Sequence, residues 1–386
     1  MKIYSEELKK IKLIDVFEIV LSGEWGEENL EDNENTAYII RTTNFLNDGT
    51  LDVENRELVK RKISREKIDE KHLKRGDIII EKSGGSPNQP VGRVVYFDIE
   101  SEKNFLCNNF TSILRVKEGI EPKYIFYFLK DCYKKRIVLK YQNKTTGIIN
   151  LKLQDYLKNT EIQLPNIEIQ KKIVEILDKA FLINSLLIEK ERRISELNKC
   201  LFSFATKRAR KLLLNEVADI TMGQSPDSKY YNTLKEGLPF FQGKTEFGEN
   251  YIKEIKYYCS CPLKIAEENS ILMSVRAPVG TVNISKVRCC IGRGLAAIIP
   301  KKIEMLYLFF ALKNLEKEIE RKGVGSTFKA ITKKDIEKIE IPIIEIKDQV
   351  DFVNRILKIE KSKFEIQQSI DETQKLFDSL MEKYFG

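Results

Sequence analysis

Glycine-containing loops with basic and amide side chains are the segments of this sequence most able to do chemistry. The longest covers residues 81–93 and reads Glu-Lys-Ser-Gly-Gly-Ser-Pro-Asn-Gln-Pro-Val-Gly-Arg. Its lysine, arginine and serine can hold phosphate oxygens, its glycines let backbone amides approach closely, and its amide side chains can address adenine or phosphate. A tight turn between two strands would have the same composition. The loop is a candidate nucleic-acid contact with a purely structural alternative.

Several shorter loops repeat this chemistry. Residues 144–147 (Lys-Thr-Thr-Gly) and 323–329 (Gly-Val-Gly-Ser-Thr-Phe-Lys) each follow an amphipathic segment and suit contact with a phosphate backbone. In the second half of the chain the matching loops are residues 223–226, 241–244, 274–276 and 292–294. The pair Gly292 and Gly294 is not a dinucleotide fingerprint, because Ala297 lies in an apolar run with no helix start.

The elements that must position these loops occur twice. Residues 162–174 (IQLPNIEIQKKIV) resemble 339–351 (IEIPIIEIKDQVD), and residues 13–19 resemble 214–220. Pro-Val-Gly at 90–92 returns at 278–280, and the aromatic segment 124–130 returns at 307–313. A repeat of this length indicates two whole domains of one design. The constant order and drifting intervals fit one scaffold that carries two diverged surfaces.

Each copy is predicted to be a mixed α/β (α+β) domain followed by a long helix. Short β-rich runs and one amphipathic helix per copy are expected before the helices. The strands are at 77–81, 91–97, 112–116, 270–275 and 294–299, and the amphipathic helices at 123–137 and 305–321. The expected domains are residues 1–165 and 209–342, with the long helices at 166–208 and 343–386.

The two long helices have apolar residues at alternating steps of three and four. Each covers about 40 residues, or ~60 Å at 1.5 Å per residue, a length typical of coiled coils. Because neither helix can bury its apolar stripe alone, we expect the two to pair as an antiparallel coiled coil. The alternative is that each helix packs only on its own domain.

Composition limits the class of protein. The 386 residues are 42% apolar, which is normal for folded domains, and the net charge of +8 would suit a polyanionic partner. No apolar stretch approaches the ~18 residues needed to span a bilayer, and the charged N-terminus favours the cytoplasm. The seven cysteines do not predict a disulfide framework. A zinc site from Cys259, Cys261, Cys289 and Cys290 is a weak alternative to reduced thiols, because the pairs lack the usual ligand spacing.

Motifs for catalysis are missing from the sequence. We find no Walker lysine loop, no nuclease carboxylate constellation, no Asn/Asp-Pro-Pro-aromatic methyltransferase tetrapeptide and no methyl-donor glycine loop. His72, the single histidine, stands in a charged run and is predicted to be a solvated surface residue. Catalysis is therefore expected in partner chains.

Taken in order, these motifs resemble the specificity subunit of type I restriction-modification systems. The resemblance covers nearly the whole chain. It rests on the tandem layout and on these segments: 76–78 before 82–85, 164–171, 223–226, 238–243, 274–280 and 325–329. Two departures are present. The second helix begins with Lys347-Asp348-Gln349, so its surface is expected to differ from that of the first. The first domain has Ser-Gly-Glu-Trp-Gly at 22–26 and an acidic run at 24–34, which phosphate would repel.

The resemblance implies a DNA-reading scaffold without chemistry of its own. Each domain would read half of a split, asymmetric site in double-stranded DNA, and the helix pair would set the gap between the halves. Two methyltransferase subunits would dock on the helices and supply S-adenosylmethionine for adenine N6 methylation. Restriction and translocation subunits would add cleavage that depends on ATP and Mg²⁺. No cofactor, metal, catalytic residue or membrane contact is expected in this chain. The base sequence read and the spacer length are not predicted.

Within that resemblance we predict DNA-binding residues in both domains. Arg276 and Arg293 are expected to read guanine and the lysines to hold phosphates. For the first half-site the candidates are Lys82, Ser83, Gln89, Arg93, Asn108, Asn109, Lys144 and Thr145. For the second they are Gln224, Ser225, Gln242, Lys244, Arg276, Arg293, Ser326, Thr327 and Lys329.

Two other classes of protein remain open at this point. A truncated enzyme that fuses recognition to methylation would carry a methyl-donor loop, which the sequence lacks. A pure interaction protein would use the coiled coil only to dimerise and would bind no DNA. Measured DNA affinity distinguishes the second alternative from the specificity subunit.

Overall fold

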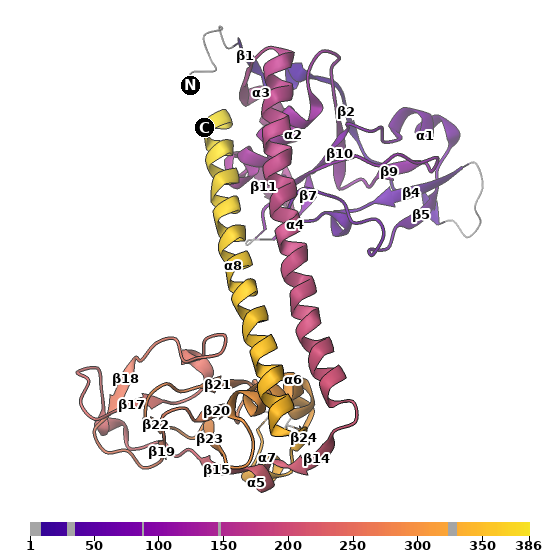
Figure 1. Ribbon diagram of the computed structural model, residues 1–386. Coiled ribbons are helices and arrows are strands. Elements are labelled where there is room, and N and C mark those ends of the chain that lie inside the picture. Colours follow the sequence, from indigo (N-terminus) through magenta and orange to yellow (C-terminus); the bar gives the residue numbers. More distant parts are fainter. Residues whose placement is uncertain (1–8, 29–34, 87–88, 146–147, 323–329) are drawn as a thin grey trace. The chain divides into compact units, whose positions relative to one another are not determined.

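The computed structural model describes residues 9–28, 35–86, 89–145, 148–322 and 330–386. The chain folds into two compact units (Figure 1). The N-terminal unit comprises residues 1–186 with 370–386, and the C-terminal unit comprises residues 187–369. Two helices of 40 residues, α4 (Ile167–Thr206) and α8 (Ile346–Phe385), each contribute one end to each unit.

The N-terminal unit is built on a central four-stranded antiparallel sheet with the order β2-β10-β6-β8. Its strands are β2 (Phe17–Ser22), β10 (Thr111–Val116), β6 (Ile78–Glu81) and β8 (Val94–Tyr96). A second sheet contains β3 (Glu27–Glu28), β5 (Val59–Lys62), β4 (Thr36–Ile40) and β9 (Phe105–Cys107), and its β4–β9 pair is parallel. Small sheets join β1 (Lys9–Lys12) to β13 (Glu161–Leu164), and β11 (Gln142–Thr145) through β12 (Ile148–Leu151) to β7 (Ser83–Gly84). The helices are α1 (Arg65–Lys71), α2 (Pro122–Lys134) and α3 (Leu153–Asn159), with 3-10 turns η1 (Leu13–Val16), η2 (Thr42–Asn44) and η3 (Ile137–Tyr141).

The C-terminal unit has a central sheet of the same order, β15-β23-β20-β21. Its strands are β15 (Ala218–Met222), β23 (Leu295–Pro300), β20 (Ile271–Ser274) and β21 (Val282–Ile284). The second sheet runs β16 (Tyr231–Asn232), β18 (Tyr257–Cys259), β17 (Leu238–Phe241), β22 (Cys289–Ile291) and β19 (Ile265–Ala266), with β17–β22 parallel. A further pair joins β14 (Arg210–Leu213) to β24 (Glu340–Ile343). The helices are α5 (Leu214–Val217), α6 (Met305–Lys322) and α7 (Lys333–Glu337), with 3-10 turns η4 (Ser228–Tyr230) and η5 (Lys244–Glu246).

The pairing of strands confirms the expected internal repeat and the mixed α/β class. In the central sheets, the β2–β10–β6 register of the first unit recurs in β15–β23–β20 of the second. Gly92 and Gly280 occupy equivalent places just before β8 and β21, both with positive φ (108° and 92°). That conformation favours glycine and explains why the Pro-Val-Gly segment returns.

One part of the repeat has a different register from the one that the prolines indicate. In β1–β13 Lys12 pairs with Glu161, and in β14–β24 Leu213 pairs with Glu340. Pro165 and Pro342 are therefore not equivalent, and the correct alignment of the two copies is shifted by two residues. In this alignment Gln349 is equivalent to Gln170. The second helix therefore has the same glutamine near its start as the first helix, whereas the alignment on the prolines puts Lys347 at that place.

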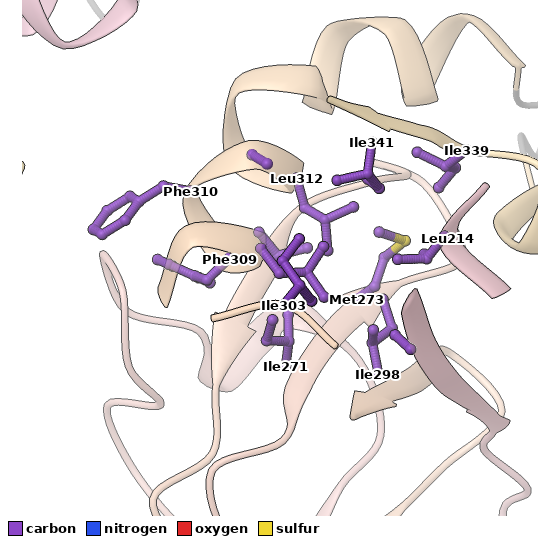
Figure 2. Close-up of a cluster of buried hydrophobic side chains, with 14 of the residues drawn as sticks. Leu214, Ile271, Met273, Ile298, Ile303, Phe309, Phe310, Leu312, Ile339 and Ile341 are labelled. Carbon is purple, nitrogen blue, oxygen red and sulfur yellow. The ribbon is translucent and has the colours of Figure 1, made fainter. Parts of the chain in front are cut away.

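The core of the C-terminal unit lies where α6 covers the central sheet. Figure 2 shows side chains from α6, the sheet and the β24 segment gathered in one cluster. Those fully or almost fully buried include Leu214, Ile271, Met273, Ile298, Phe309, Leu312, Ile339 and Ile341. The N-terminal unit has an equivalent core under α2, whose residues from Tyr124 to Leu129 are all buried. Burial of this aromatic segment explains its repetition in the sequence.

Helices α4 and α8 contact each other within each unit. In the N-terminal unit the Asn184 amide donates to Gln374 Oε1 at 3.1 Å. In the C-terminal unit the Asn198 amide donates to Glu360 Oε1 at 3.0 Å, and Lys363 Nζ lies 3.8 Å from Glu191 Oε1. A higher number on α4 meets a lower number on α8, so the two helices run antiparallel within this unit.

Candidate nucleic-acid interface

Three loops of the C-terminal unit meet at one end of its parallel β17–β22 pair. They follow β15, β17 and β22, and backbone hydrogen bonds join them. Gln224 N–H donates to Ile291 O at 3.0 Å, Gly292 N–H to Phe241 O at 2.8 Å, and Gly223 N–H to Leu295 O at 2.8 Å. We call this set of three bonds the loop frame.

Glycine is required inside the loop frame because the backbones approach so closely. A Cβ atom on Gly223 would lie 2.1 Å from Gly292 O, and one on Gly294 would lie 2.4 Å from Gln242 O. Both distances are far below any normal carbon–oxygen contact. In contrast, a Cβ atom on Gly243 would meet nothing within 4 Å. The frame therefore explains the glycines at 223 and 294 by packing.

Polar side chains stand on this frame with their ends in solvent. Gln224, Gln242 and Arg293 are all exposed, and the frame brings their backbones together. Ser225 Oγ accepts a hydrogen bond from Arg293 N–H at 3.2 Å, which links the loops that follow β15 and β22. Amide and guanidinium groups presented together from rigid turns are the groups that hydrogen-bond base edges.

Two other predicted residues of this unit lie close to the loop frame in the chain. Arg276 is exposed and comes just after β20, where Val275 N–H donates to Gly294 O at 2.9 Å. Lys244 is exposed at the start of η5, two residues after Gln242. Ser326, Thr327 and Lys329, also predicted for this half-site, lie outside the described residues.

The N-terminal unit has the same loop frame. Glu24 N–H donates to Cys107 O at 2.8 Å, Asn108 N–H to Ile40 O at 3.0 Å, and Gly23 N–H to Thr111 O at 3.0 Å. A Cβ atom on Gly23 would lie 2.2 Å from Asn108 O, which matches the situation of Gly223. By these bonds Glu24 is the equivalent of Gln224, Arg41 of Gln242, and Asn109 of Arg293.

Glu24 carries neighbours that change its electrostatics. Its Oε2 lies 3.0 Å from Lys71 Nζ and 3.2 Å from Lys67 Nζ, both on α1. Burial opposes ionisation of Glu24, but hydrogen bonds and charge from the two lysines outweigh it and lower its pKa. The trio has a net charge of about +1. Within the acidic segment at 24–34, the charge of Glu24 is therefore compensated by the two lysines. Residues 29–34 of that segment lie outside the described residues.

Several residues predicted for the first half-site have structural partners. The Arg93 guanidinium makes two hydrogen bonds to the buried Glu81 carboxylate, at 2.8 and 3.1 Å. Asn108 is buried and its Oδ1 accepts from Thr111 Oγ1 at 3.2 Å. Ser83 Oγ donates to Asn150 Oδ1 at 2.6 Å. These contacts hold the loops in place and leave these three groups occupied within the unit.

The other predicted residues of this unit differ in exposure. Gln89 and Asn109 are exposed. Lys82 is half-buried and donates to Ser22 Oγ, and burial lowers its pKa. Lys144 and Thr145 belong to β11, and their side chains are not described. Sequence reasoning missed Glu24 and Arg41 as equivalents of Gln224 and Gln242. The glycine before Glu24 was the available signal, because Gly-Glu at 23–24 stands where Gly-Gln stands at 223–224.

Metal and membrane features are limited in the described part of the chain. No group of three or more His, Cys, Asp or Glu residues there could hold a metal ion. Cys259, Cys289 and Cys290 are buried and Cys261 is exposed. Across the same residues, no helix has the length and apolar content to cross a membrane.

The fold and the two loop frames define a protein with two domains of one design that carry different side chains at equivalent loop positions. The family model for the type I restriction modification DNA specificity domain matches residues 5–199 and 210–374. The chain therefore belongs to this family and carries its domain twice. The expected class, a DNA specificity subunit of a type I restriction-modification system, is confirmed. Subunits of this class supply specificity and no catalysis of their own.

Known relatives match along nearly the whole chain. The putative type I restriction enzyme MjaX specificity subunit of Methanocaldococcus jannaschii is 33% identical over 382 residues, covering 92% of this chain and 86% of that protein. A chain from a structure described as complex assembly and conformational transition of the type I R-M system has a TM-score of 0.65 at 24% identity, covering 98% and 99% of the two chains. The type I S subunit from M. genitalium has a TM-score of 0.60 at 19% identity, with 100% and 98% covered. These structural likenesses concern the fold alone.

Proposed function

We propose that each unit reads one half of a split site in double-stranded DNA with the side chains on its loop frame. The observation that carries the proposal is that the two frames share their backbone hydrogen bonds and the tightly packed glycine at 23 and 223 while the side chains on them differ. Glu24, Arg41 and Asn109 stand in one frame, and Gln224, Gln242 and Arg293 in the other. One scaffold with two sets of side chains is what two different half-sites require.

The proposed roles follow from side-chain chemistry. Arg276 and Arg293 offer the paired N–H donors that match guanine O6 and N7, and Gln224 and Gln242 can pair with adenine. Lys244 and, in the first unit, Lys82, Lys144 and Gln89 are assigned to phosphates, with Thr145, Ser326, Thr327 and Lys329 as further backbone contacts. Arg93, Asn108, Ser83 and Ser225 are assigned to holding the loops.

Partner subunits would supply the chemistry. We assign the docking surface for two methyltransferase subunits to the long helices, which expose apolar side chains in both units. In the N-terminal unit Leu182 and Leu186 are 57% and 59% exposed, and in the C-terminal unit Phe204 is 82% exposed. Exposed apolar groups of this size mark interaction sites. The methyltransferase subunits would bring S-adenosylmethionine, and restriction subunits would bring ATP- and Mg²⁺-dependent cleavage.

The test is methylation of a genome by the assembled complex. The chain is co-expressed with its methyltransferase subunit in a host without such a system, and N6-methyladenine is mapped by single-molecule sequencing. A two-part motif with a fixed gap is expected. Each base contact contributes ~1–3 kcal/mol and contacts at separated positions add roughly, so both halves of the site should be required. A stable complex that methylates no defined motif would contradict the proposal and favour a pure interaction protein.

A further inference from the structure

We propose that Glu24 is a specificity-determining residue that accepts a hydrogen bond from the exocyclic amino group of cytosine or adenine in the first half-site. This inference rests on the proposed function and deepens it, because it gives one residue a base class. Glu24 belongs to the acidic segment 24–34. The negative charge of that segment, considered alone, argues against contact with DNA.

Position is the first argument. Glu24 follows the tightly packed Gly23, and its N–H is fixed to Cys107 O, as that of Gln224 is fixed to Ile291 O. The backbone at this position is therefore held in the same way in both units. Of the two equivalent side chains, Gln224 is exposed and Glu24 retains 22% exposure of its side chain. Part of the Glu24 side chain therefore remains accessible at this position.

Charge compensation is the second argument. A lone carboxylate close to DNA would be repelled by phosphates. Lys71 and Lys67 hold Oε2 from α1, and the trio remains net positive. The recorded contacts of both lysines are to Oε2, and we assign Oε1 to the hydrogen bond with the base. The ion pairs also fix the side-chain rotamer, which lowers the entropy lost on binding.

The chemistry of the carboxylate then selects the base. An ionised carboxylate only accepts hydrogen bonds. In the major groove, cytosine N4 and adenine N6 carry amino donors, whereas guanine O6 and thymine O4 present lone pairs that would repel it. Gln224, with an amide that both donates and accepts, cannot make the same distinction. The two units therefore select bases by different chemistry at these equivalent positions.

The experiment compares methylation motifs of three complexes: wild type, Glu24→Gln and Gln224→Ala. The wild-type complex is expected to require cytosine or adenine at one position of one half-site. Glu24→Gln should reduce the discrimination at that position by roughly tenfold or more while the other half-site stays unchanged. Gln224→Ala serves as the matched control and should relax only the opposite half-site.

A second measurement needs only the wild-type protein, in case the variant complex does not assemble. Duplexes are prepared in which the selected base is replaced by its analogue without the exocyclic amino group, purine for adenine or 2-pyrimidinone for cytosine. Binding of the complex, measured by fluorescence anisotropy, should weaken by roughly tenfold. The same replacement at other positions of the half-site tests whether the effect is local.

The outcomes separate the inference from the proposed function. A wild-type motif that Glu24→Gln leaves unchanged, or a uniform fall in methylation at every sequence, overturns the role of Glu24 and leaves the specificity function intact. Equal binding of the duplex with and without the amino group overturns it as well. Absence of any motif in the wild type overturns the proposed function, and the inference with it.

Discussion

Gln349 and Glu304 are joined at the start of α8, where the Gln349 side-chain oxygen accepts a hydrogen bond from the Glu304 N–H at 2.9 Å. The Gln349 amide nitrogen donates to Ile344 O at 2.8 Å, and the side chain is only 1% exposed. At the start of α4, Gln170 makes the same two bonds, to Glu121 N–H at 2.9 Å and Pro165 O at 2.7 Å. A buried glutamine near its start thus attaches each long helix to its domain.

Replacing this glutamine should destabilise the unit that it anchors. In Gln349→Leu a part-buried N–H and a part-buried carbonyl lose their partners, and each unsatisfied group costs about 1–3 kcal/mol. We expect the free energy of unfolding of the C-terminal unit to fall by about 2–3 kcal/mol, measured by urea denaturation followed by circular dichroism. The exposed Gln368→Leu, on the same helix and in the same unit, is the control and should change it by less than about 0.5 kcal/mol. If the Gln349→Leu variant is as stable as the control variant, Gln349 does not anchor the helix.

The glycines of the loop frame give a sharper prediction about function. Gly223→Ala forces a Cβ atom to within 2.1 Å of Gly292 O, so the three loops must separate. We expect the complex to lose recognition of the second half-site and the unit to lose about 1–3 kcal/mol of stability, as overpacking does. Gly243→Ala lies in the same loops but meets open space, and it should leave the methylation motif unchanged. Indistinguishable motifs in the two variants would contradict the frame.

The repeat, the fold class and the long helices could be predicted because they depend on periodic apolar patterns. The strand runs at 77–81 and 270–275 and the aromatic helices appear in the structure within a few residues of the expected bounds. The register of the repeat could not be fixed from Pro165 and Pro342, because the proline is not what the helix start depends on. The helix start depends on the buried Gln170 and Gln349. Their role is visible only from the hydrogen bonds in the structure.

The sequence predicts which types of residue the candidate site contains. It does not predict which of their side chains are already bonded within the protein. Arg93 and Asn109 are both plausible DNA contacts in the sequence. Only packing shows that the Arg93 guanidinium is held by Glu81 while Asn109 is exposed. In the sequence, the charge of Glu24 argues against DNA contact. The two lysines that compensate it are more than 40 residues away in the chain and reach it only through the placement of α1.

A buried carboxylate makes the stability of the C-terminal unit depend on pH. Burial raises the pKa of Glu246 above its ordinary value of 4.5, and among the described residues no donor reaches its Oε2. Asn44, at the equivalent place in the N-terminal unit, instead donates to Asp52 O at 3.1 Å. Since the folded state holds the Glu246 proton more tightly than the unfolded state does, this residue costs stability as the pH rises above 4.5 and the cost is complete above the folded pKa.

Glu246→Gln should remove this cost. We expect the variant to unfold with a free energy about 1 kcal/mol higher than wild type at pH 7.5, because a buried carboxylate with one oxygen lacking a donor among the described residues is replaced by a neutral group. The difference should shrink as the pH falls toward 4.5 and vanish below it, where the wild-type side chain is also neutral. Urea denaturation at several pH values gives both quantities. A stability difference that is constant with pH would place its cause in packing and not in ionisation.

Salt dependence distinguishes phosphate contacts from base contacts in the second half-site. Lys244 and Arg293 are both exposed cations, so charge alone does not separate them. If Lys244 holds a phosphate, Lys244→Ala should weaken binding on every sequence and reduce the slope of log K against log salt by about 0.9. If Arg293 reads a base, Arg293→Ala should weaken binding to the cognate site by ~1–3 kcal/mol and relax one position of the motif. Titrations of the complex with cognate and non-cognate duplexes at several salt concentrations measure both. An Arg293→Ala loss that is equal on both duplexes would assign Arg293 to the phosphate backbone.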